Sequence, residues 1–278
     1  MSKKIVFLFL TLLMAVSVTC ALGEGRLVAL TPSDCEILCA IGCEDRLVGR
    51  GMYCDYPESI QHLPVVHSGA EANIEEILAL EPDIVFMSDM ADTDDLVVML
   101  EANQVKVVVN HADTIPDVYE SIRMIGVSTG KEQEAEKVIN DMQSAFEAIS
   151  ARSASEGKTI YFEVTPLQWG LWSAGNGTFM DELASICGLN NVFADTPGWF
   201  QISQEQVIAR NPDYIVSIAG MGESAVEEIL NRPGWEDLTA VKNGHVFNAD
   251  SNAIARPGPR LKDAALELFG FISGSEKE

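Results

Sequence analysis

Residues 73–86 read N-I-E-E-I-L-A-L-E-P-D-I-V-F, and residues 203–216 read S-Q-E-Q-V-I-A-R-N-P-D-Y-I-V. Each stretch starts with a residue that can cap a helix, Asn73 or Ser203, and has a glutamate two places later. Each then passes through Pro-Asp, which stops the helix, into an apolar run that is typical of a buried parallel strand. A helix–stop–strand unit that recurs after about 130 residues predicts two lobes with one plan, and two similar lobes can enclose a ligand in the cleft between them.

Predicted strands and helices alternate in both halves of the chain. Strands are expected at 27–31, 84–87 and 105–109 in the first half, and at 159–164 and 214–218 in the second. The segments between them carry helical periodicity and capping residues. This alternation implies parallel βαβ units, so we expect an α/β fold with two Rossmann-like lobes, each built on a parallel sheet.

One uninterrupted helical segment separates the two halves. Residues 131–154 contain neither proline nor glycine, and they predict a helix of roughly 20 residues that is about 30 Å long. Its position makes it a rigid connector of the two lobes, with the ligand cleft between them. The predicted organisation is a leader at residues 1–23, an N-terminal lobe at 24–129, the connecting helix at 130–156 and a C-terminal lobe at 157–278.

The leader has the pattern of a secretory signal peptide. Two lysines precede an apolar run at residues 5–18, which is short for a membrane span, and small residues follow it. The alternatives are cleavage after Ala21 or Gly23, acylation of Cys20 as in a lipoprotein, and a permanent N-terminal anchor. We expect an extracytoplasmic protein, in the periplasm or on the outer face of the cytoplasmic membrane. Acylation of Cys20 stays open, and such a lipid would be its only membrane attachment.

The composition excludes several kinds of partner. The chain has 18 lysines and arginines against 42 acidic residues, a formal net charge of −24. Such a charge argues against binding to nucleic acid or to an anionic membrane surface, and it disfavours a strongly anionic ligand. We expect no enzyme, because the chain contains neither a His-Glu-x-x-His metalloprotease motif nor a phosphate-binding Gly-x-x-x-x-Gly-Lys motif.

The cysteines allow more than one interpretation. Five of the six remain if Cys20 is cleaved off or acylated, so at least one thiol is unpaired. Three of them fall on one stripe of a predicted helix, where they can pack in the core, pair with Cys54 or bind a metal. We expect no metal, because three ligands on one helix without a nearby histidine make a poor zinc site. The pairing stays open among Cys35, Cys39, Cys43, Cys54 and Cys187.

Five short motifs follow one another along nearly the whole mature chain. They are Leu30-Thr31-Pro32-Ser33 with the helix that ends at Gly42, Asp45-Arg46-Leu47-Val48-Gly49, Asn73-Ile74-Glu75, Leu80-Glu81-Pro82-Asp83 and Arg256-Pro257-Gly258-Pro259-Arg260. In this order they resemble the bacterial solute-binding proteins of the metal-chelate class. The resemblance implies two lobes joined by a rigid helix, and the delivery of cobalamin, haem or a ferric siderophore to an ABC importer.

The loop Tyr53-Cys54-Asp55-Tyr56-Pro57 most resembles that of the cobalamin-binding members of this class. It follows a predicted strand, at the edge where open α/β sheets bind ligands, and tyrosine can stack on a flat macrocycle. In the second lobe we expect two tryptophans in loops before helices, where they can reach the cleft, and one loop arginine that can bind the ligand. The predicted ligand contacts are Tyr53, Asp55, Tyr56, Trp172, Trp199 and Arg256. Core or surface packing is the alternative for each of them, and Arg260 is expected to serve its own helix.

Glu75 and Glu205 occupy corresponding places in the repeated stretch. The resemblance implies that these two carboxylates dock onto arginines of the permease dimer, which works with an ATPase. Two acidic side chains, one on each lobe, suit a two-fold symmetric basic partner. The alternative is that each glutamate only complements the N-terminus of its own helix, and both roles can coexist. We expect the binding protein to be a monomer.

The favoured ligand is a cobalamin-like corrinoid, because haem and ferric siderophores are commonly anionic and this chain has few cations. Haem or a ferric siderophore is the alternative, with Tyr53 or His67 as an axial ligand of iron. Related cobalamin binders can carry a tryptophan in the stretch that here contains His67. A bound free metal ion is not favoured, because the four histidines are scattered along the chain. A sensor or adhesin with the same fold is the remaining alternative.

Overall fold

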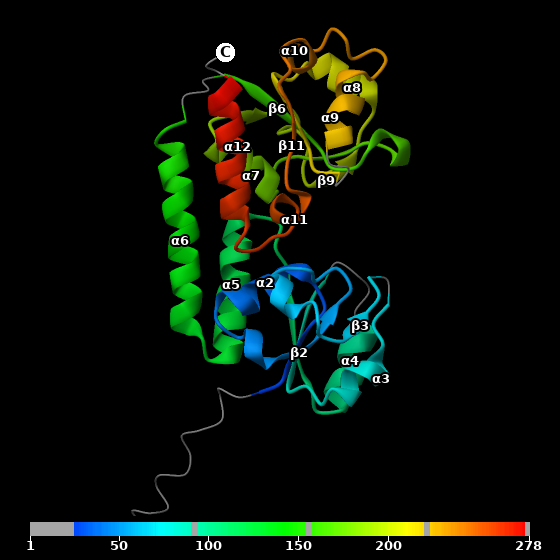
Figure 1. Ribbon diagram of the computed structural model, residues 1–278, viewed down its shortest axis with the longest axis vertical. Coiled ribbons are helices and arrows are strands. Elements are labelled where there is room, and N and C mark those ends of the chain that lie inside the picture. Colours follow the sequence, from blue (N-terminus) through cyan, green and yellow to red (C-terminus); the bar gives the residue numbers. More distant parts are fainter. Residues whose placement is uncertain (1–24, 70, 90–93, 154–156, 220–222, 276–278) are drawn as a thin grey trace, which may run out of the picture.

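The computed structural model describes residues 25–69, 71–89, 94–153, 157–219 and 223–275. The predicted leader, with Cys20, lies outside these residues. The molecule has two lobes stacked along its long axis, and a long helix, α6 (Glu132–Ser150), runs along one side of both (Figure 1). Of the helices that the structure describes, none is long and apolar enough to cross a membrane.

The N-terminal lobe is built around a parallel sheet of five strands. Their order is β3 (Val65–His67), β2 (Leu47–Gly51), β1 (Leu27–Ala29), β4 (Ile84–Ser88) and β5 (Lys106–Asn110). The connections contain α2 (Pro32–Ala40), α3 (Ile74–Ala79), α4 (Asp94–Ala102) and the short 3-10 helices η1 (Glu44–Arg46) and η2 (Glu58–Ile60). The predicted parallel βαβ arrangement is confirmed in this lobe.

Helices cover both faces of this sheet. Leu27 and Phe86 belong to the core cluster that includes α2, whereas Val28 and Val85 pack with residues of α3 and α4. Successive side chains of a strand point to opposite faces, so a strand that is covered on both sides needs apolar residues at every position. This explains the unbroken apolar runs of β1 and β4.

The C-terminal lobe repeats the plan with a smaller sheet. Its parallel strands are β11 (Val246–Asn248), β10 (Tyr214–Ser217), β6 (Thr159–Glu163) and β8 (Asn190–Asn191). A separate antiparallel pair joins β7 (Trp172–Ala174) to β9 (Trp199–Gln201). The helices are α7 (Phe179–Ile186), α8 (Gln204–Arg210), α9 (Glu223–Leu230), α10 (Thr239–Lys242), α11 (Ser251–Ile254) and α12 (Leu261–Ser275), with the 3-10 helix η3 (Leu167–Trp169) before β7. The repeated sequence stretches therefore become α3–β4 in one lobe and α8–β10 in the other.

Two antiparallel helices link the lobes (Figure 1). The predicted connecting helix is present as α6, with 19 residues. Before it, α5 (Ile115–Thr129) starts at a capping box on Thr114 and ends at Gly130, whose φ of 70° is left-handed. The first N–H of α5, on Ile115, donates to the carboxylate of Glu182 in the C-terminal lobe. The sequence predicted only the second helix of this pair as the connector.

The stretch Gly126-Val127-Ser128-Thr129-Gly130 matches the G-x-S-x-G pattern of a hydrolase nucleophile elbow. An elbow holds its serine on a sharp turn between a strand and a helix. Ser128 instead lies within the last turn of α5. Gly126 has a packing role, because a Cβ on it would lie 2.6 Å from the Cβ of Ala135 on α6. The motif is therefore a helix end packed against the next helix.

Asp34 is a fully buried acid in the first turn of α2. Its carboxylate accepts hydrogen bonds from the hydroxyl of Thr31, at 2.5 Å, and from the side-chain amide of Asn110. Burial raises the pKa of Asp34 from 3.8 to about 6, although both hydrogen bonds act in the opposite direction. The folded state therefore binds a proton more tightly at this site than the unfolded chain does, and the stability that this provides is lost as the pH rises through 6.

We expect Asp34→Asn to remove this pH dependence. The amide can donate to Thr31 and accept from Asn110, so it keeps both contacts without a buried charge. Between about pH 4 and about pH 7, the unfolding free energy of the variant relative to the wild type should rise by up to about 3 kcal/mol. Urea titrations across this range measure the difference. The exposed Asp45→Asn is the matched control, and an equal slope for both variants would contradict the assignment.

Candidate functional site

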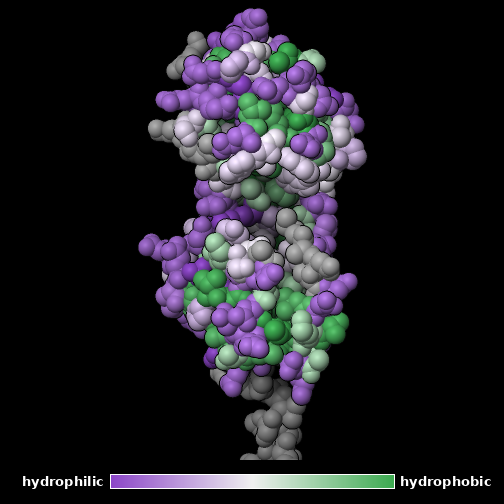
Figure 2. Space-filling view, turned by 90° about the vertical axis from the view of Figure 1, so that its right-hand side faces the viewer, coloured by the Kyte–Doolittle hydropathy of each residue, from purple (hydrophilic) through white to green (hydrophobic). Residues whose placement is uncertain are grey.

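The carboxyl ends of both sheets point toward the boundary between the lobes. Just after β5, the carbonyl of Asp113 accepts a hydrogen bond from the N–H of Phe179 in the C-terminal lobe, at 2.6 Å. Just after β11, the side-chain amide of Asn252 reaches Asp55 of the N-terminal lobe at 3.5 Å. Figure 2 shows the indentation that separates the lobes. Open α/β sheets bind ligands at this edge, so the candidate site lies between the lobes.

The loop of Tyr53, Asp55 and Tyr56 follows β2 at this boundary. Tyr53 and Tyr56 are exposed by 57% and 46%. The guanidinium of Arg50 holds the loop from below, since it donates to the carbonyls of Gly51, Met52, Cys54 and Gln61. The ring of Tyr53 rests on Gly69, where a Cβ would lie 2.3 Å from the ring and where φ is 89°. Both tyrosines are therefore exposed to solvent on a loop whose backbone is held by the hydrogen bonds of Arg50.

Trp172 and Trp199 lie on the β7–β9 pair, and their predicted position in loops is wrong. Trp172 is paired with Gln201, and Trp199 with Ala174. Directly paired residues share a face and alternate residues share it too, so both indoles project from one side of the pair. The two tryptophans on that side are exposed by 40% at Trp172 and 36% at Trp199. The ring of Trp199 also packs 5.3 Å from that of Phe179, which places it beside the crossover between the lobes.

Arg256 is the centre of a polar cluster between the lobes. Its guanidinium donates to Asp55 at 2.6 Å, to Glu36 at 2.9 Å and to the backbone carbonyl of Tyr53 at 3.2 Å, as well as to Asn252 in its own lobe. The side chain is only 12% exposed. Four of the five N–H donors of Arg256 therefore serve protein partners, and a ligand could engage Nη1 or Nη2 only by displacing one of them.

Arg260 belongs to the same cluster, and the prediction that it serves its own helix is wrong. It donates to Glu36 at 3.1 Å, and its guanidinium lies 4.2 Å from the centre of the Tyr56 ring. Burial raises the pKa of Glu36, although hydrogen bonds from both arginines oppose the shift. Burial is the largest single influence on Asp55 and acts to raise its pKa, but the hydrogen bond and charge of Arg256, a backbone hydrogen bond and the charge of Arg260 together outweigh it, so the net pKa is lowered.

Glu36 is a residue that sequence reasoning missed. It is an acid in a predicted helix, which is an ordinary surface pattern, but the structure buries it with 3% exposure. A partner for these arginines could have been predicted from the motif Arg256-Pro257-Gly258-Pro259-Arg260. Two arginines close together in a rigid turn often share one carboxylate as a hydrogen-bond acceptor.

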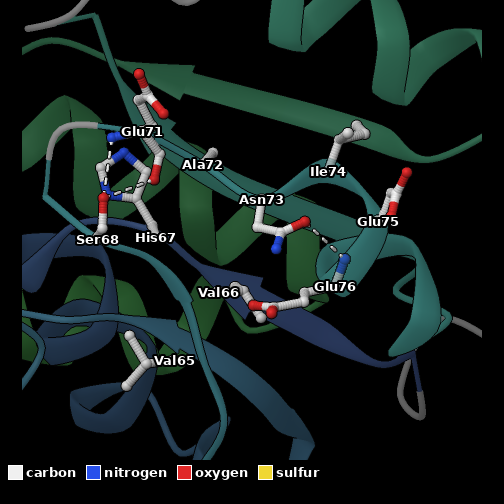
Figure 3. A pocket seen from close by; sticks show the side chains of 10 residues that line it. All are labelled: Val65, Val66, His67, Ser68, Glu71, Ala72, Asn73, Ile74, Glu75 and Glu76. Atoms are coloured by element: carbon white, nitrogen blue, oxygen red, sulfur yellow. Dashed lines mark hydrogen bonds between the residues drawn. The ribbon is translucent and has the colours of Figure 1, made fainter.

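His67 lines an open hollow between β3 and the start of α3 (Figure 3). Its Nδ1 accepts a hydrogen bond from the N–H of Gly69 at 3.0 Å, and burial lowers the pKa of the imidazole. While Nδ1 accepts this hydrogen bond, a neutral ring carries its proton on Nε2, so binding of a metal by either nitrogen would require this arrangement to change. The axial-ligand role of His67 stays a prediction. The other lining residues are Val65, Val66, Ser68, Glu71, Ala72, Asn73, Ile74, Glu75 and Glu76.

Glu75 and Glu205 occupy the second position of α3 and α8 and are both exposed. The caps of the two helices also correspond, because Asn73 accepts from the N–H of Glu76 and Ser203 from that of Gln206. A hydrogen bond with Ser203 lowers the pKa of Glu205. Each carboxylate sits where a helix N-terminus favours negative charge and remains free to meet a partner. Their docking role stays a prediction.

His111 is a second missed residue, on the crossover that follows β5. Its two ring nitrogens lie 3.0 Å from Asp89 and 2.9 Å from Asp113, and the hydrogen bond with Asp89 is the main cause of its raised pKa. All three side chains are about half exposed. Across the described ranges, no group of three or more His, Cys, Asp or Glu side chains is arranged to hold a metal ion.

Comparison with known proteins agrees with this architecture. A family model described as periplasmic binding protein matches residues 27–253. The chain is 33% identical over 254 residues to YvrC, an ABC transporter substrate-binding lipoprotein of Bacillus subtilis, with 89% of this chain and 79% of that protein covered. It is 29% identical over 252 residues to a vitamin B12-binding protein of Salmonella typhimurium, with 89% and 90% covered.

A solved structure has the same fold. The periplasmic heme-binding protein HutB of Vibrio cholerae matches with a TM-score of 0.81 and 23% sequence identity, over 89% of this chain and 98% of that one. The family consists of solute-binding proteins of transport systems rather than enzymes. The chain therefore belongs to the periplasmic binding protein family, and within it to the metal-chelate class of ABC transporter substrate-binding proteins.

Proposed function

We propose that this protein binds a cobalamin-like corrinoid between its lobes and delivers it to an ABC importer. The observation that carries the proposal is the shared exposed face of Trp172 and Trp199 on the β7–β9 pair. Together with the exposed rings of Tyr53 and Tyr56 on the other lobe, it offers aromatic surface on both sides of the cleft. A flat, weakly charged macrocycle suits such surfaces, since indole and phenol rings stack and still donate hydrogen bonds.

The charges near the cleft also favour a corrinoid. The guanidinium groups of Arg256 and Arg50 are bound to protein oxygens, and His111 lies between two carboxylates. An anionic haem or ferric siderophore would meet few unoccupied cations among these residues. The B12-binding relative supports the same ligand. Haem and ferric siderophores are the alternative ligands that the binding experiment must distinguish from a corrinoid.

We place the protein outside the cytoplasm as a monomer, with no catalytic activity, no nucleic-acid partner and a lipid on Cys20 as its membrane attachment. Its partner is a permease dimer with an ATPase. The lipoprotein relative supports the anchor. The exposed Glu75 and Glu205, at equivalent positions of the two lobes, support docking to a two-fold symmetric basic surface.

Calorimetric titration of the mature protein with cyanocobalamin, cobinamide, haemin and a ferric siderophore tests the ligand. We expect one-to-one binding of the corrinoids and little heat with the others. Heat with haemin or the siderophore alone would overturn the corrinoid assignment and leave the transport role. The absence of binding by all four compounds would count against the proposed ligand class as a whole.

Trp199→Ala should weaken corrinoid binding by at least about 1 kcal/mol, which is about a fivefold higher Kd, because an indole loses its stacking surface. Trp199→Phe keeps an aromatic face and should recover part of the affinity. Val127→Ala, at an exposed position on α5, is the control and should bind as the wild type does. Equal affinity of Trp199→Ala and the control would move Trp199 out of the ligand site.

The double variant Glu75→Gln with Glu205→Gln should bind the ligand normally but lose stimulation of the transporter ATPase in proteoliposomes. The change removes two charges at the proposed contact and leaves the cleft intact. The matched control is Glu76→Gln with Glu227→Gln. It removes the same total charge from two other exposed positions, one next to Glu75 on α3 and one on α9. Wild-type stimulation by the first double variant would contradict the docking assignment.

A further inference from the structure

Two buried thiols meet beneath the tyrosine loop. Cys35 lies in α2 and Cys54 in the loop itself, and both are fully buried. Their Sγ atoms point at one acceptor, the carbonyl of Ala29, at 3.7 Å and 3.8 Å. The two thiols are also within hydrogen-bonding contact of each other. Gly51 permits this approach, because a Cβ there would lie 2.1 Å from the Leu30 carbonyl and 3.3 Å from the Cys54 sulfur.

The remaining described cysteines are placed differently. Cys187 lies in the other lobe, where its thiol donates to the carbonyl of Ala265 at 3.7 Å. Cys43 has its sulfur 3.8 Å from the guanidinium of Arg46, and Cys39 is half-buried further along α2. Cys35 and Cys54 are thus the pair whose sulfurs the fold directs to one point.

We propose that Cys35 and Cys54 form a disulfide bond that fixes the tyrosine loop to α2. The inference rests on the extracytoplasmic location of the proposed function, because structural disulfides persist in oxidising compartments. The oxidant is a protein or small-molecule disulfide, such as a thiol–disulfide oxidoreductase of that compartment. One cysteine thiolate attacks it to form a mixed disulfide, and the second thiolate then displaces the carrier thiol. The carrier gains two electrons, and the two cysteines release two protons.

The bond must form before the fold closes. The hydrogen bond with Cys54 and the burial both raise the pKa of Cys35 well above its ordinary value, so the folded protein holds little thiolate at this site. Disulfide exchange requires a thiolate and access to it. We therefore expect the oxidation to take place while the exported chain is folding. Once formed, the bond is protected from reductants by the same burial.

The bond would act on the cleft through the loop. Cys54 stands between Tyr53 and Asp55, and Cys35 directly precedes Glu36. The ionic contacts of Arg256 already draw Asp55 and Glu36 together. A covalent link beside them holds the same two segments when these ion pairs are broken, and it closes a chain segment of about 20 residues, which restricts the unfolded state.

Mass spectrometry tests the bond without any ligand, so its failure is separate from that of the proposed function. The full chain is exported into an oxidising bacterial compartment, and thiols are blocked with N-ethylmaleimide in denaturant without reductant. Trypsin leaves Cys54 in a peptide of residues 51–106, and Cys35, Cys39 and Cys43 in a peptide of residues 27–46. We expect these two peptides to be joined, and to stay joined in Cys39→Ser, in Cys43→Ser and in the variant with both changes.

Cys54→Ser should release the two peptides. A linked pair that is lost in Cys39→Ser or Cys43→Ser would assign the bond to a different cysteine and overturn the proposal. Full labelling of all described cysteines in the exported wild type would overturn it as well.

Thermal unfolding provides the second readout. When the protein has been unfolded and refolded in reductant, the Tm of the wild type should fall by roughly 5 °C or more. Cys187→Ser keeps the pair and should show the same fall, whereas Cys54→Ser should show none. A wild type that is unaffected by this treatment would contradict a structural bond at this site.

Discussion

The arrangement of the two lobes depends on one buried carboxylate, that of Glu36. Its two oxygens each accept a guanidinium N–H from the opposite lobe, one from Arg256 and one from Arg260. A buried charge is tolerated only when it is paired, so the loss of both arginines would leave the Glu36 carboxylate uncompensated in the interface. The same arginines hold Asp55 and the ring of Tyr56. The same set of contacts therefore acts both on the orientation of the lobes and on the shape of the tyrosine loop.

Local sequence patterns predicted most of the fold because helix capping, helix termination and strand burial depend on residues that are close together in the sequence. The cap, the Pro-Asp stop and the apolar run of residues 73–86 and 203–216 specify a helix, its end and a strand without reference to the rest of the chain. Trp172 and Trp199 were misplaced because they lie in strands of three residues, which are too short to show an alternating pattern. The pairing of β7 with β9 is a contact in space that no local window contains.

The candidate site was predicted only in part for the same reason. The tyrosine loop follows a strand and could be assigned to the ligand edge from the sequence. Arg256 could be recognised as a loop cation, but its partner Glu36 lies 220 positions earlier and has the local pattern of a surface acid. Five cysteines likewise allowed several pairings until the structure brought Cys35 and Cys54 to the same carbonyl. Side chains that meet across the fold are the part that composition and spacing do not encode.

Because α6 is one unbroken helix, the ligand specificity of this protein can change without a change in the spacing of its lobes. The helix packs against α5 and against α7 and α12 of the C-terminal lobe, so its length sets the distance between the lobes. Glu75 and Glu205 stand on the first turns of α3 and α8, outside the loops that line the cleft. Substitutions in those loops can change which molecule is carried and leave the spacing of the two carboxylates untouched. With the docking role proposed for these carboxylates, cargo and transporter could be selected separately within one scaffold.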